Sequence, residues 1–523
     1  MDKFETLKRY FGYDSFREGQ ELLIDSILGG QDVLGIMPTG AGKSVCYQVP
    51  ALMLPGITLV ISPLISLMKD QVQTLNQAGV HAAYINSSLT ENQISKALQL
   101  AERGQYKIVY VAPERLETYG FQHFAHSVEI SMVAVDEAHC ISQWGQDFRP
   151  SYLKIVQFVK GFSNRPVLSA FTATATEAVK KDIMSTLELQ RPQLLVTGYD
   201  RKNLYFGVEN VKQKDAYLLR YVKAHSGESG IIYCATRKNV EKVYELLWEN
   251  ELPVTKYHAG LSPDERRLNQ DDFIYDRKSI VVATNAFGMG IDKSNVRYVL
   301  HYNMPQSMEN YYQEAGRAGR DGEESECILL YSPQDVMINR YLIQNKEQNT
   351  EDFTVQELEE IRRRDEEKLK KMTFYSTTKK CLRSYILRYF GEWGTQDCGN
   401  CSCCLQKAEP ERVPFEPAFV PGPQEDLVAT YSHKKVGGKR PTDNLDERQK
   451  ECFEALRALR LEISREEGVP PYVVFSDKTL IDMCVKMPDT KEKMLKVSGV
   501  GELKYEKYGG KFLRALADHA LQS

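Results

Sequence analysis

One short stretch organises this chain: Met37-Pro38-Thr39-Gly40-Ala41-Gly42-Lys43-Ser44. It follows a run of strand length at residues 32–36 and precedes a helical stretch. Glycines let the backbone curl so that its N–H groups face phosphate oxygens. Residues 39–44 therefore predict a nucleotide site, in which Lys43 reaches the β- and γ-phosphates and Ser44 holds Mg²⁺. A strict Walker pattern has glycine where Met37 stands, and a glycine-rich turn without function is the alternative.

Short apolar runs alternate with helical stretches on both sides of this loop. Continuous apolar runs of strand length are typical of strands buried on both faces of a parallel sheet. Before residue 195 they occupy residues 57–61, 108–111 and 132–135, and after residue 205 they occupy residues 230–233, 279–283, 296–300 and 327–330. The pattern predicts an α/β fold of two doubly wound lobes that meet near residues 195–205.

The bulk composition is that of an ordinary globular protein. With 523 residues the chain exceeds one hydrophobic core, and its net charge is −4. Average charge therefore does not favour nucleic acid, and a binding groove would need local clustering of charge or backbone and aromatic contacts. No apolar run approaches the roughly 18 residues of a membrane span, and residues 1–5 lack a signal pattern. We expect a cytosolic protein that does not enter membranes, nucleoid-associated if bacterial.

An acidic cluster, Asp136-Glu137-Ala138-His139, follows the predicted strand at residues 132–135. Phosphoryl transfer needs a metal-binding carboxylate and a water-orienting group opposite the lysine loop. We expect Asp136 to bind Mg²⁺, Glu137 to polarise the attacking water, and His139 to sense the γ-phosphate.

A second cluster, Gln313-Glu314-Ala315-Gly316-Arg317-Ala318-Gly319-Arg320, belongs to the second lobe. Two arginines three residues apart share one face of a helix. Facing the nucleotide, they would stabilise charge on the γ-phosphate, with Arg320 as finger and Arg317 as phosphate contact. Two solvated surface arginines are the alternative. Residues 284–292 form a glycine-rich loop suited to nucleic-acid contact, and residues 169–175 suit a coupling element.

Four of the eleven cysteines follow metal-site spacing. They are Cys381, Cys398, Cys401 and Cys404, and four thiolates in this pattern suit a structural, tetrahedral Zn²⁺ site. Cys403 could in principle replace Cys404, but the two-residue spacing favours Cys404, and a redox or iron–sulfur site is the alternative. Upstream, residues 351–371 predict part of a helical hairpin. Downstream, residues 405–441 have the proline-rich composition of a linker, and the last residues predict a small all-α domain.

Together these motifs resemble the RecQ family of superfamily 2 DNA helicases over residues 1–406 and 442–523. The resemblance implies RecA-like lobes at 1–197 and 198–332, a helical zinc-binding module at 333–406, a linker at 407–441 and an HRDC domain at 442–523. It implies ATP, Mg²⁺ and Zn²⁺ as cofactors. Tyr13, Arg17 and Gln20 resemble the family's adenine-reading element, and Gln313 joins the nucleotide-contacting residues.

The segment after the acidic cluster, residues 140–150, is similar to the family's aromatic-rich loop, which couples single-strand binding to hydrolysis. Trp144 and Phe148 offer faces for base stacking, and Arg149 offers charge. Packing of both rings in the core is the alternative.

RecQ enzymes usually carry a winged-helix domain between the zinc module and the HRDC domain. Here only residues 405–441 separate them, which is too short for that domain. The resemblance implies a 3′-to-5′ DNA helicase of recombination, repair and the SOS response. The alternatives are an ATP-gated translocase with weak strand separation and an RNA-directed DEAH-type helicase. We expect single-stranded and partly duplex DNA and a single-strand-binding protein as partners, and a monomer.

Replacing Trp144 by alanine tests the aromatic loop. Stacking on each base contributes about 1–3 kcal/mol, so the loss of the ring should uncouple DNA binding from turnover. ATPase assays with and without single-stranded DNA should show an unchanged basal rate and lost stimulation. Unchanged stimulation would instead support the alternative that Trp144 packs in the core.

Overall fold

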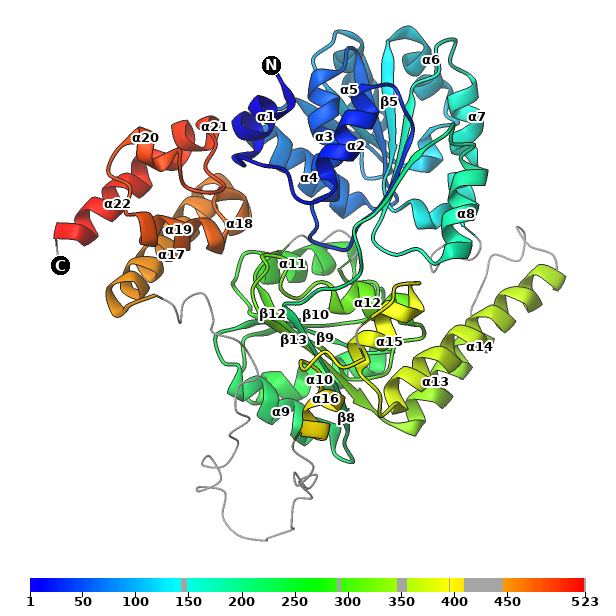
Figure 1. Cartoon of the computed structure of the whole chain (residues 1–523), viewed down its shortest axis with the longest axis vertical. Helices are drawn as coiled ribbons and strands as arrows, with labels where there is room; N and C mark the ends of the chain where they lie inside the picture. Colours follow the sequence, from blue (N-terminus) through cyan, green and yellow to red (C-terminus); the bar gives the residue numbers. More distant parts are fainter. Residues whose placement is uncertain (143–147, 289–292, 346–354, 395, 409–444, 522–523) are drawn as a thin grey trace.

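The computed structural model describes residues 1–142, 148–288, 293–345, 355–394, 396–408 and 445–521. These residues form two α/β lobes, a helical module and a small helical domain (Figure 1). The predicted linker at residues 407–441 lies almost wholly outside the described residues.

The first lobe is a seven-stranded parallel sheet in the order β3-β4-β2-β5-β6-β1-β7. Its strands are β1 (Val33–Ile36), β2 (Ile57–Ile61), β3 (Ala82–Ile85), β4 (Ile108–Val111), β5 (Ile130–Val135), β6 (Val167–Thr172) and β7 (Gln193–Val196). Every residue of β1, β2 and β4 is buried, as their continuous apolar sequences predicted.

Helices bury both faces of this sheet. One face packs on α2 (Gln20–Leu28), α3 (Lys43–Met53) and α4 (Ile65–Gln77), which share a core. The other face packs on α5 (Glu91–Glu102), α6 (Tyr119–Ser127), α7 (Lys154–Lys160) and α8 (Glu177–Thr186). The chain begins with the short α1 (Lys3–Thr6) and a π-helical turn, Leu7–Phe11. This double winding confirms the predicted fold class.

The second lobe is a six-stranded parallel sheet in the order β10-β11-β9-β12-β13-β8. Its strands are β8 (Leu204–Asn210), β9 (Ser229–Tyr233), β10 (Val254–Tyr257), β11 (Ile280–Ala283), β12 (Val296–His301) and β13 (Ser325–Tyr331). Its helices are α9 (Lys214–Ala224), α10 (Arg237–Glu249), α11 (Pro263–Ile274) and α12 (Met308–Ala315). The chain passes from one sheet to the other between Val196 and Leu204, within the predicted meeting region.

A helical unit that we call the cysteine module, residues 333–408, packs on the second lobe. It contains α13 (Pro333–Gln344), α14 (Val355–Thr377), α15 (Leu382–Tyr389) and α16 (Ser402–Ala408). Helices α13 and α14 lie side by side, which matches the predicted hairpin (Figure 1). The module attaches to β8 through a bridge between Phe206 and Cys401 and through the Val208 amide, which donates to Ser402 Oγ at 3.2 Å.

The C-terminal domain, residues 445–521, is all-helical and has its own core. Its helices are α17 (Glu447–Glu467), α18 (Pro471–Val474), α19 (Asp477–Lys486), α20 (Lys491–Met494), α21 (Glu502–Lys504) and α22 (Gly510–Leu521). The domain lies beside α1 and α4 of the first lobe (Figure 1). Among the described helices, none has the length and apolar character needed to cross a bilayer.

Hydrogen bonds to backbone carbonyls hold the C-terminal domain on the lobes. The Gly499 amide donates to Gly12 O at 3.1 Å, and Lys8 Nζ donates to Leu495 O at 2.9 Å. The second lobe contributes Tyr275, whose hydroxyl donates to Gly468 O at 3.0 Å. The domain therefore contacts both lobes.

One buried carboxylate fastens the strand that precedes the phosphate loop. Asp32 is 2% exposed and receives both terminal nitrogens of Arg165, at 3.0 and 2.7 Å. It also accepts the amides of Leu168 at 2.9 Å and Gln190 at 2.7 Å. These bonds join the starts of β1 and β6 to the segment that enters β7.

Asp32→Ala should lower the free energy of unfolding of the first lobe by about 3–5 kcal/mol, because it leaves a guanidinium and two amides unpaired. Urea denaturation measures the loss. The control is Asp25→Ala, since Asp25 pairs with Lys3 at an exposed site and should contribute under about 1 kcal/mol. Equal losses in the two variants would contradict the prediction.

Candidate active site

The phosphate loop begins at the carboxyl end of β1. Met37 is buried in the core beneath α2, α3 and α4, and its amide donates to Thr172 O at 3.0 Å. Its carbonyl accepts Lys43 Nζ at 3.1 Å. The side chain at position 37 faces the core and not the phosphate side, so the departure from the strict Walker pattern leaves the loop intact.

Two glycines give the loop its curl. Gly40 and Gly42 have φ of 85° and 83°, a region that side chains disfavour, and α3 starts directly after them at Lys43. A β-carbon on Gly42 would lie 2.5 Å from Gln20 Nε2. A helix start presents backbone N–H groups and the positive end of the helix dipole, so the start of α3 at Lys43 is a suitable site for phosphate.

The predicted adenine-reading residues lie against this loop. Gln20 Nε2 donates to Ala41 O at 3.2 Å and to Gly42 O at 3.0 Å, and the Arg17 guanidinium donates to Gly40 O. Tyr13 is 43% exposed and lines the same cavity. Arg17 and Gln20 therefore contact the backbone of the phosphate loop directly.

The predicted metal-binding carboxylate follows β5 in a buried position. Asp136 is 7% exposed, and its amide donates to Ile61 O at 2.9 Å. Burial and the neighbouring Glu137 carboxylate raise the pKa of Asp136 to about 7. A divalent cation would offset this cost, and Asp136 shares the cavity with the Ser44 hydroxyl. Hard oxygen donors of this kind fit Mg²⁺.

Glu137 adopts a left-handed backbone conformation, with φ 48° and ψ 46°. Its Oε2 lies 3.3 Å from His139 Nδ1, which also lies 3.0 Å from Thr172 Oγ1. Burial by itself raises the pKa of Glu137, but His139 and Lys43 outweigh it and lower the pKa to about 2. A carboxylate this acidic is suited to orient and polarise water rather than to keep its proton.

The two arginines of the second lobe lie in turns. Helix α12 ends at Ala315, so the expectation that Arg317 and Arg320 share a helical face is wrong. The helix does not continue to Arg320 because Gly319 has φ 55°, outside the helical range. The Gly319 amide donates to Val296 O at 2.9 Å and not to a carbonyl of the preceding helical turn.

The glycine-rich loop after β11 holds one of these arginines. Arg317 is 7% exposed and donates to Gly288 O. Gly288 has φ 101°, and a β-carbon there would lie 2.5 Å from Arg317 Nε. The remainder of that predicted loop, residues 289–292, lies outside the described residues.

A single cavity of about 440 Å³ brings the predicted nucleotide residues of both lobes together. The predicted residues that line it are Tyr13, Arg17, Gln20, Thr39, Gly40, Gly42, Lys43, Ser44, Asp136, Glu137, His139, Gln313, Arg317 and Arg320. Ala41 is absent from the lining, and its carbonyl faces Gln20. The C-terminal domain adds Tyr472, Val473, Ser476 and Lys504, a contribution that no local sequence signal indicated.

The aromatic-rich loop is described only in part, because residues 143–147, including Trp144, lie outside the described residues. Arg149 donates from Nη1 to Pro63 O at 3.0 Å, and its amide donates to Cys140 O at 2.8 Å. Arg149 thus ties the loop to the segment between β2 and α4. Neither Phe148 nor Arg149 lines the nucleotide cavity.

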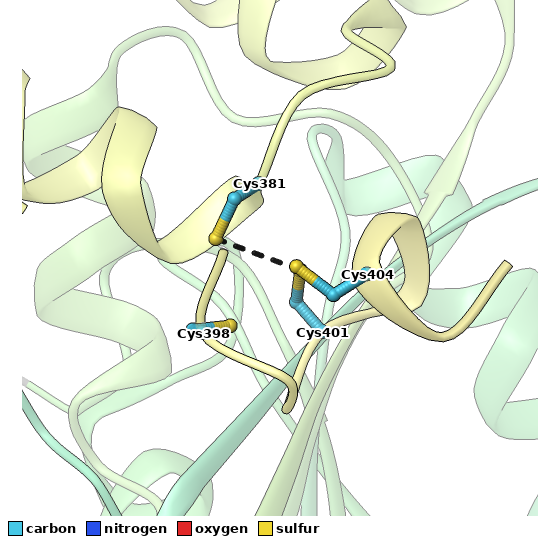
Figure 2. A group of neighbouring side chains, drawn as sticks. All are labelled: Cys381, Cys398, Cys401 and Cys404. Carbon is cyan, nitrogen blue, oxygen red and sulfur yellow. Dashed lines mark hydrogen bonds between the residues drawn. The ribbon is translucent and has the colours of Figure 1, made fainter. Parts of the chain in front are cut away.

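Four cysteines converge in the cysteine module (Figure 2). The Sγ atoms of Cys381, Cys398, Cys401 and Cys404 all lie within 4.8 Å of one another. Amides support two of them, since Ser384 N donates to Cys381 Sγ at 3.5 Å and Asn400 N donates to Cys398 Sγ at 3.3 Å.

The fifth nearby thiol is turned elsewhere. Cys403 Sγ donates to Thr378 O at 3.5 Å and does not belong to the cluster. The structure therefore gathers Cys404 and not Cys403, and a four-thiolate set of this size fits a tetrahedral Zn²⁺ ion.

Fold and site define a two-lobed, ATP-dependent helicase, and sequence models of protein families agree. A DEAD/DEAH box helicase model matches residues 17–182, and a helicase conserved C-terminal domain matches residues 213–322. A RecQ zinc-binding model matches residues 333–405, and an HRDC domain matches residues 449–516.

Curated relatives identify the family. The chain is 41% identical to the ATP-dependent DNA helicase RecQ of Bacillus subtilis strain 168 over 589 residues, covering 98% of each chain. It is 35% identical to the protein of the same name from Haemophilus influenzae, covering 98% of this chain and 95% of that one. The chain belongs to the RecQ family of ATP-dependent DNA helicases.

Solved structures share the fold. The DEAD-box helicase Mss116 bound to single-stranded RNA has a TM-score of 0.54 at 17% identity, covering 72% of this chain and 87% of that one. The DUF1998 helicase MrfA bound to DNA and AMPPNP also has a TM-score of 0.54, at 19% identity, covering 80% of this chain and 61% of that one.

The comparison with the Bacillus relative also shows a difference in length. The alignment runs over 589 positions, whereas this chain has 523 residues, so the relative carries residues without a counterpart here. The zinc-binding match ends at residue 405 and the HRDC match begins at residue 449. The short interval leaves no room for a further domain of ordinary size between them.

Proposed function

We propose that this DNA helicase translocates 3′-to-5′ along single-stranded DNA and separates duplexes during recombination and repair. The observation that carries the proposal is the single cavity in which Lys43 and Asp136 of one lobe meet Arg320 of the other. Hydrolysis in such a site depends on the relative position of the lobes, so it can drive stepwise movement of one lobe against the other.

The roles divide by chemistry. Lys43 and the amides at the start of α3 hold the β- and γ-phosphates, while Arg17 and Gln20 read the base. Ser44 and Asp136 hold Mg²⁺, which supplies charge neutralisation on the phosphates when bound. We assign the orientation of water to Glu137, and the stabilisation of transition-state charge to Arg320 assisted by Arg317.

The cysteine cluster is proposed to hold a structural Zn²⁺ ion. All four donors are protein thiolates, so no position is left for a substrate. The ion would fix α15 and α16 relative to β8, because the cluster includes Cys401, which bridges to Phe206.

A translocase with weak strand separation is the second candidate. The short interval between residues 405 and 449 favours it, because a winged helix that would grip the duplex does not fit there. In either case we propose a monomer in the bacterial cytosol near the nucleoid, with single-strand-binding protein as a partner.

A strand-displacement assay separates the candidates. We expect ATP-dependent displacement of a labelled strand from a duplex with a 3′ single-stranded tail, and much slower displacement with a 5′ tail. Lys43→Ala should abolish hydrolysis and displacement while DNA binding by fluorescence anisotropy persists, because the proposed role of Lys43 is in phosphate binding and not in DNA contact. DNA-stimulated hydrolysis without displacement would favour the translocase, and stimulation by RNA alone would contradict both.

Zinc content tests the cysteine cluster. The wild type and Cys403→Ser should each release about one zinc ion per chain when thiols are blocked, as a chromophoric indicator detects. Cys404→Ser should bind zinc weakly and lower the unfolding temperature of the module, because metal binding there contributes folding free energy. The reverse behaviour of the two variants would show that Cys403 is the fourth ligand.

A further inference from the structure

A guanidinium in the segment between the sheets connects the two halves of the nucleotide site. Arg201 lies between β7 and β8. Its Nη1 donates to Thr39 O in the phosphate loop at 2.7 Å and to Gly316 O at 3.3 Å. Its Nη2 donates to Ala318 O at 3.0 Å and to Gly319 O at 2.7 Å. One planar group therefore contacts the phosphate loop of one lobe and the arginine turn of the other.

The geometry of arginine is essential to this arrangement. A guanidinium presents its donors in a rigid, planar fork, whereas an ammonium is a compact charge at the end of a flexible stem. Only the fork can hold carbonyls of residues 39, 316, 318 and 319 at fixed relative positions. Asn203 supports the same turn, because its Nδ2 donates to Gly319 O at 2.9 Å and to Glu323 O at 2.8 Å.

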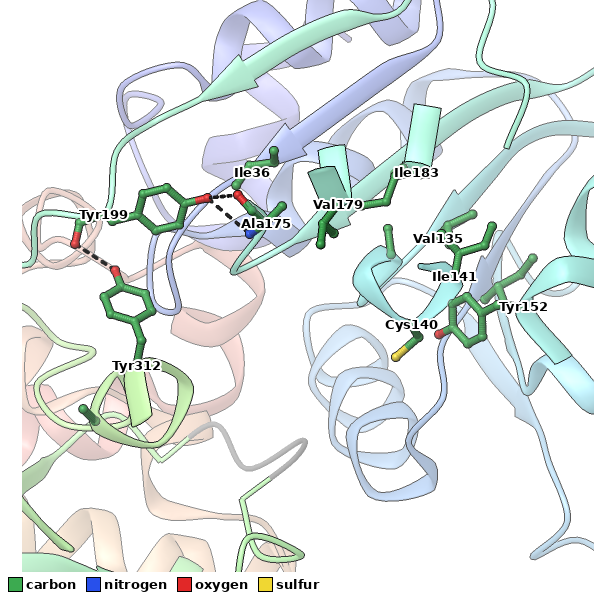
Figure 3. Close-up of a cluster of buried hydrophobic side chains, with 14 of the residues drawn as sticks. Ile36, Val135, Cys140, Ile141, Tyr152, Ala175, Val179, Ile183, Tyr199 and Tyr312 are labelled. Atoms are coloured by element: carbon green, nitrogen blue, oxygen red, sulfur yellow. Dashed lines mark hydrogen bonds between the residues drawn. The ribbon is translucent and has the colours of Figure 1, made fainter. Parts of the chain in front are cut away.

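The segment that carries Arg201 is itself held by both lobes. The Tyr199 hydroxyl donates to Ala175 O at 2.9 Å and accepts the Ala175 amide at 3.2 Å, and Tyr199 O accepts the Tyr312 hydroxyl at 2.9 Å (Figure 3). Ala175 lies three residues after Thr172, whose hydroxyl is 3.0 Å from His139 Nδ1. The backbone near Arg201 is thus connected to the γ-phosphate side of the first lobe and to α12 of the second.

The cysteine module also contacts the segment that carries Arg201, in addition to the two lobes. Arg383, on α15, donates from Nη1 to Asp200 Oδ1 and to Arg201 O, both at 2.7 Å, and also donates to Leu204 O. Phe390 stacks on Tyr199 with ring centroids 4.5 Å apart. Cys381 caps the start of α15 and Arg383 lies two residues later. The cysteine cluster and the arginine that holds the Arg201 segment therefore depend on the same turn of helix.

We propose that Arg201 is a positioning residue that locks the turn of Arg317 and Arg320 against the phosphate loop, and that Arg383 holds Arg201 in place. The inference rests on the proposed function, because it assumes that Lys43 binds phosphate and Arg320 acts on the γ-phosphate. It assigns the cysteine module a part in hydrolysis that does not require contact with nucleotide.

The expected kinetic signature follows from where the contacts lie. Most nucleotide-contacting residues belong to the first lobe, so the loss of Arg201 should leave nucleotide affinity nearly unchanged. Without Arg201, the turn that carries Arg317 and Arg320 would no longer be held at a fixed position relative to the phosphates. A misplacement of about 1 Å can cost about 100-fold in rate. The defect should therefore appear in kcat and not in KM.

Arg201→Met and Arg201→Lys test the proposal through DNA-stimulated ATPase rates and the Kd of a fluorescent ATP analogue. We expect kcat to fall about 10- to 100-fold in Arg201→Met, less in Arg201→Lys, with Kd unchanged within about twofold. Lys202→Ala is the matched control, because Lys202 is the exposed neighbour on the same segment and should behave as the wild type. Thermal unfolding identifies a folding defect, in which case Arg201→Lys carries the test.

A double-mutant cycle with Arg320→Ala distinguishes positioning from a general structural role. If Arg201 acts through Arg320, the double variant should be no slower than Arg320→Ala alone, whereas independent defects would multiply. Arg383→Met should reproduce a weaker form of the kcat loss. Its control is Arg388→Met, an exposed arginine on α15, which should retain the wild-type rate.

Three results would decide against the proposal or its premise. Wild-type kcat in Arg201→Met, with Lys43→Ala inactive and Arg320→Ala slowed but measurable, would overturn the positioning role and leave the proposed function standing. Multiplying losses in the double variant would also overturn it. Retained turnover in Lys43→Ala would instead refute the site on which the proposal rests.

Discussion

Two sheets supply opposite walls of the nucleotide cavity, and neither wall contains the full set of groups that phosphoryl transfer needs. The first sheet brings the phosphate loop and the acidic cluster to the ends of β1 and β5. The second brings Gln313 and the arginine turn. The geometry between the sheets therefore decides whether the site is complete. A buried cluster that runs from the first lobe through Ala175, Tyr199 and Tyr312 to the second maintains that geometry (Figure 3).

Much of the site could be predicted because its chemistry depends on short-range spacing. A phosphate loop, an acidic pair after a strand and a four-cysteine pattern are local, since each needs residue types at fixed separations along the chain. The strands at residues 57–61 and 108–111 match their predicted bounds for a similar reason: burial on both faces imposes continuous apolar sequence. Met37 departs from the strict Walker pattern, yet its buried side chain is compatible with the phosphate loop. A strict sequence pattern can therefore reject a loop that the structure retains.

The parts that sequence reasoning missed are those made by backbone groups across long separations. Arg201 joins the phosphate loop to the arginine turn through the carbonyl oxygens of residues 39, 316, 318 and 319, and any residue type supplies a carbonyl. The end of α12 at Ala315 depends on a bond from Gly319 to Val296, which no helical pattern reports. The docking of the C-terminal domain likewise uses Gly12 and Gly499. A β-carbon on Gly12 would lie 2.8 Å from Gly501 N, so bare backbone is needed for the close approach.

The cavity wall contributed by the C-terminal domain has a consequence for inhibitor design. A small molecule that fills the nucleotide cavity beyond the phosphates would touch Tyr472, Val473, Ser476 and Lys504 in addition to residues of both lobes. A helicase built from two lobes alone cannot present those four side chains. Selectivity among ATP-competitive compounds can therefore be sought at the edge of the site, where the scaffold varies, and not at the phosphate loop, whose chemistry all such motors must share.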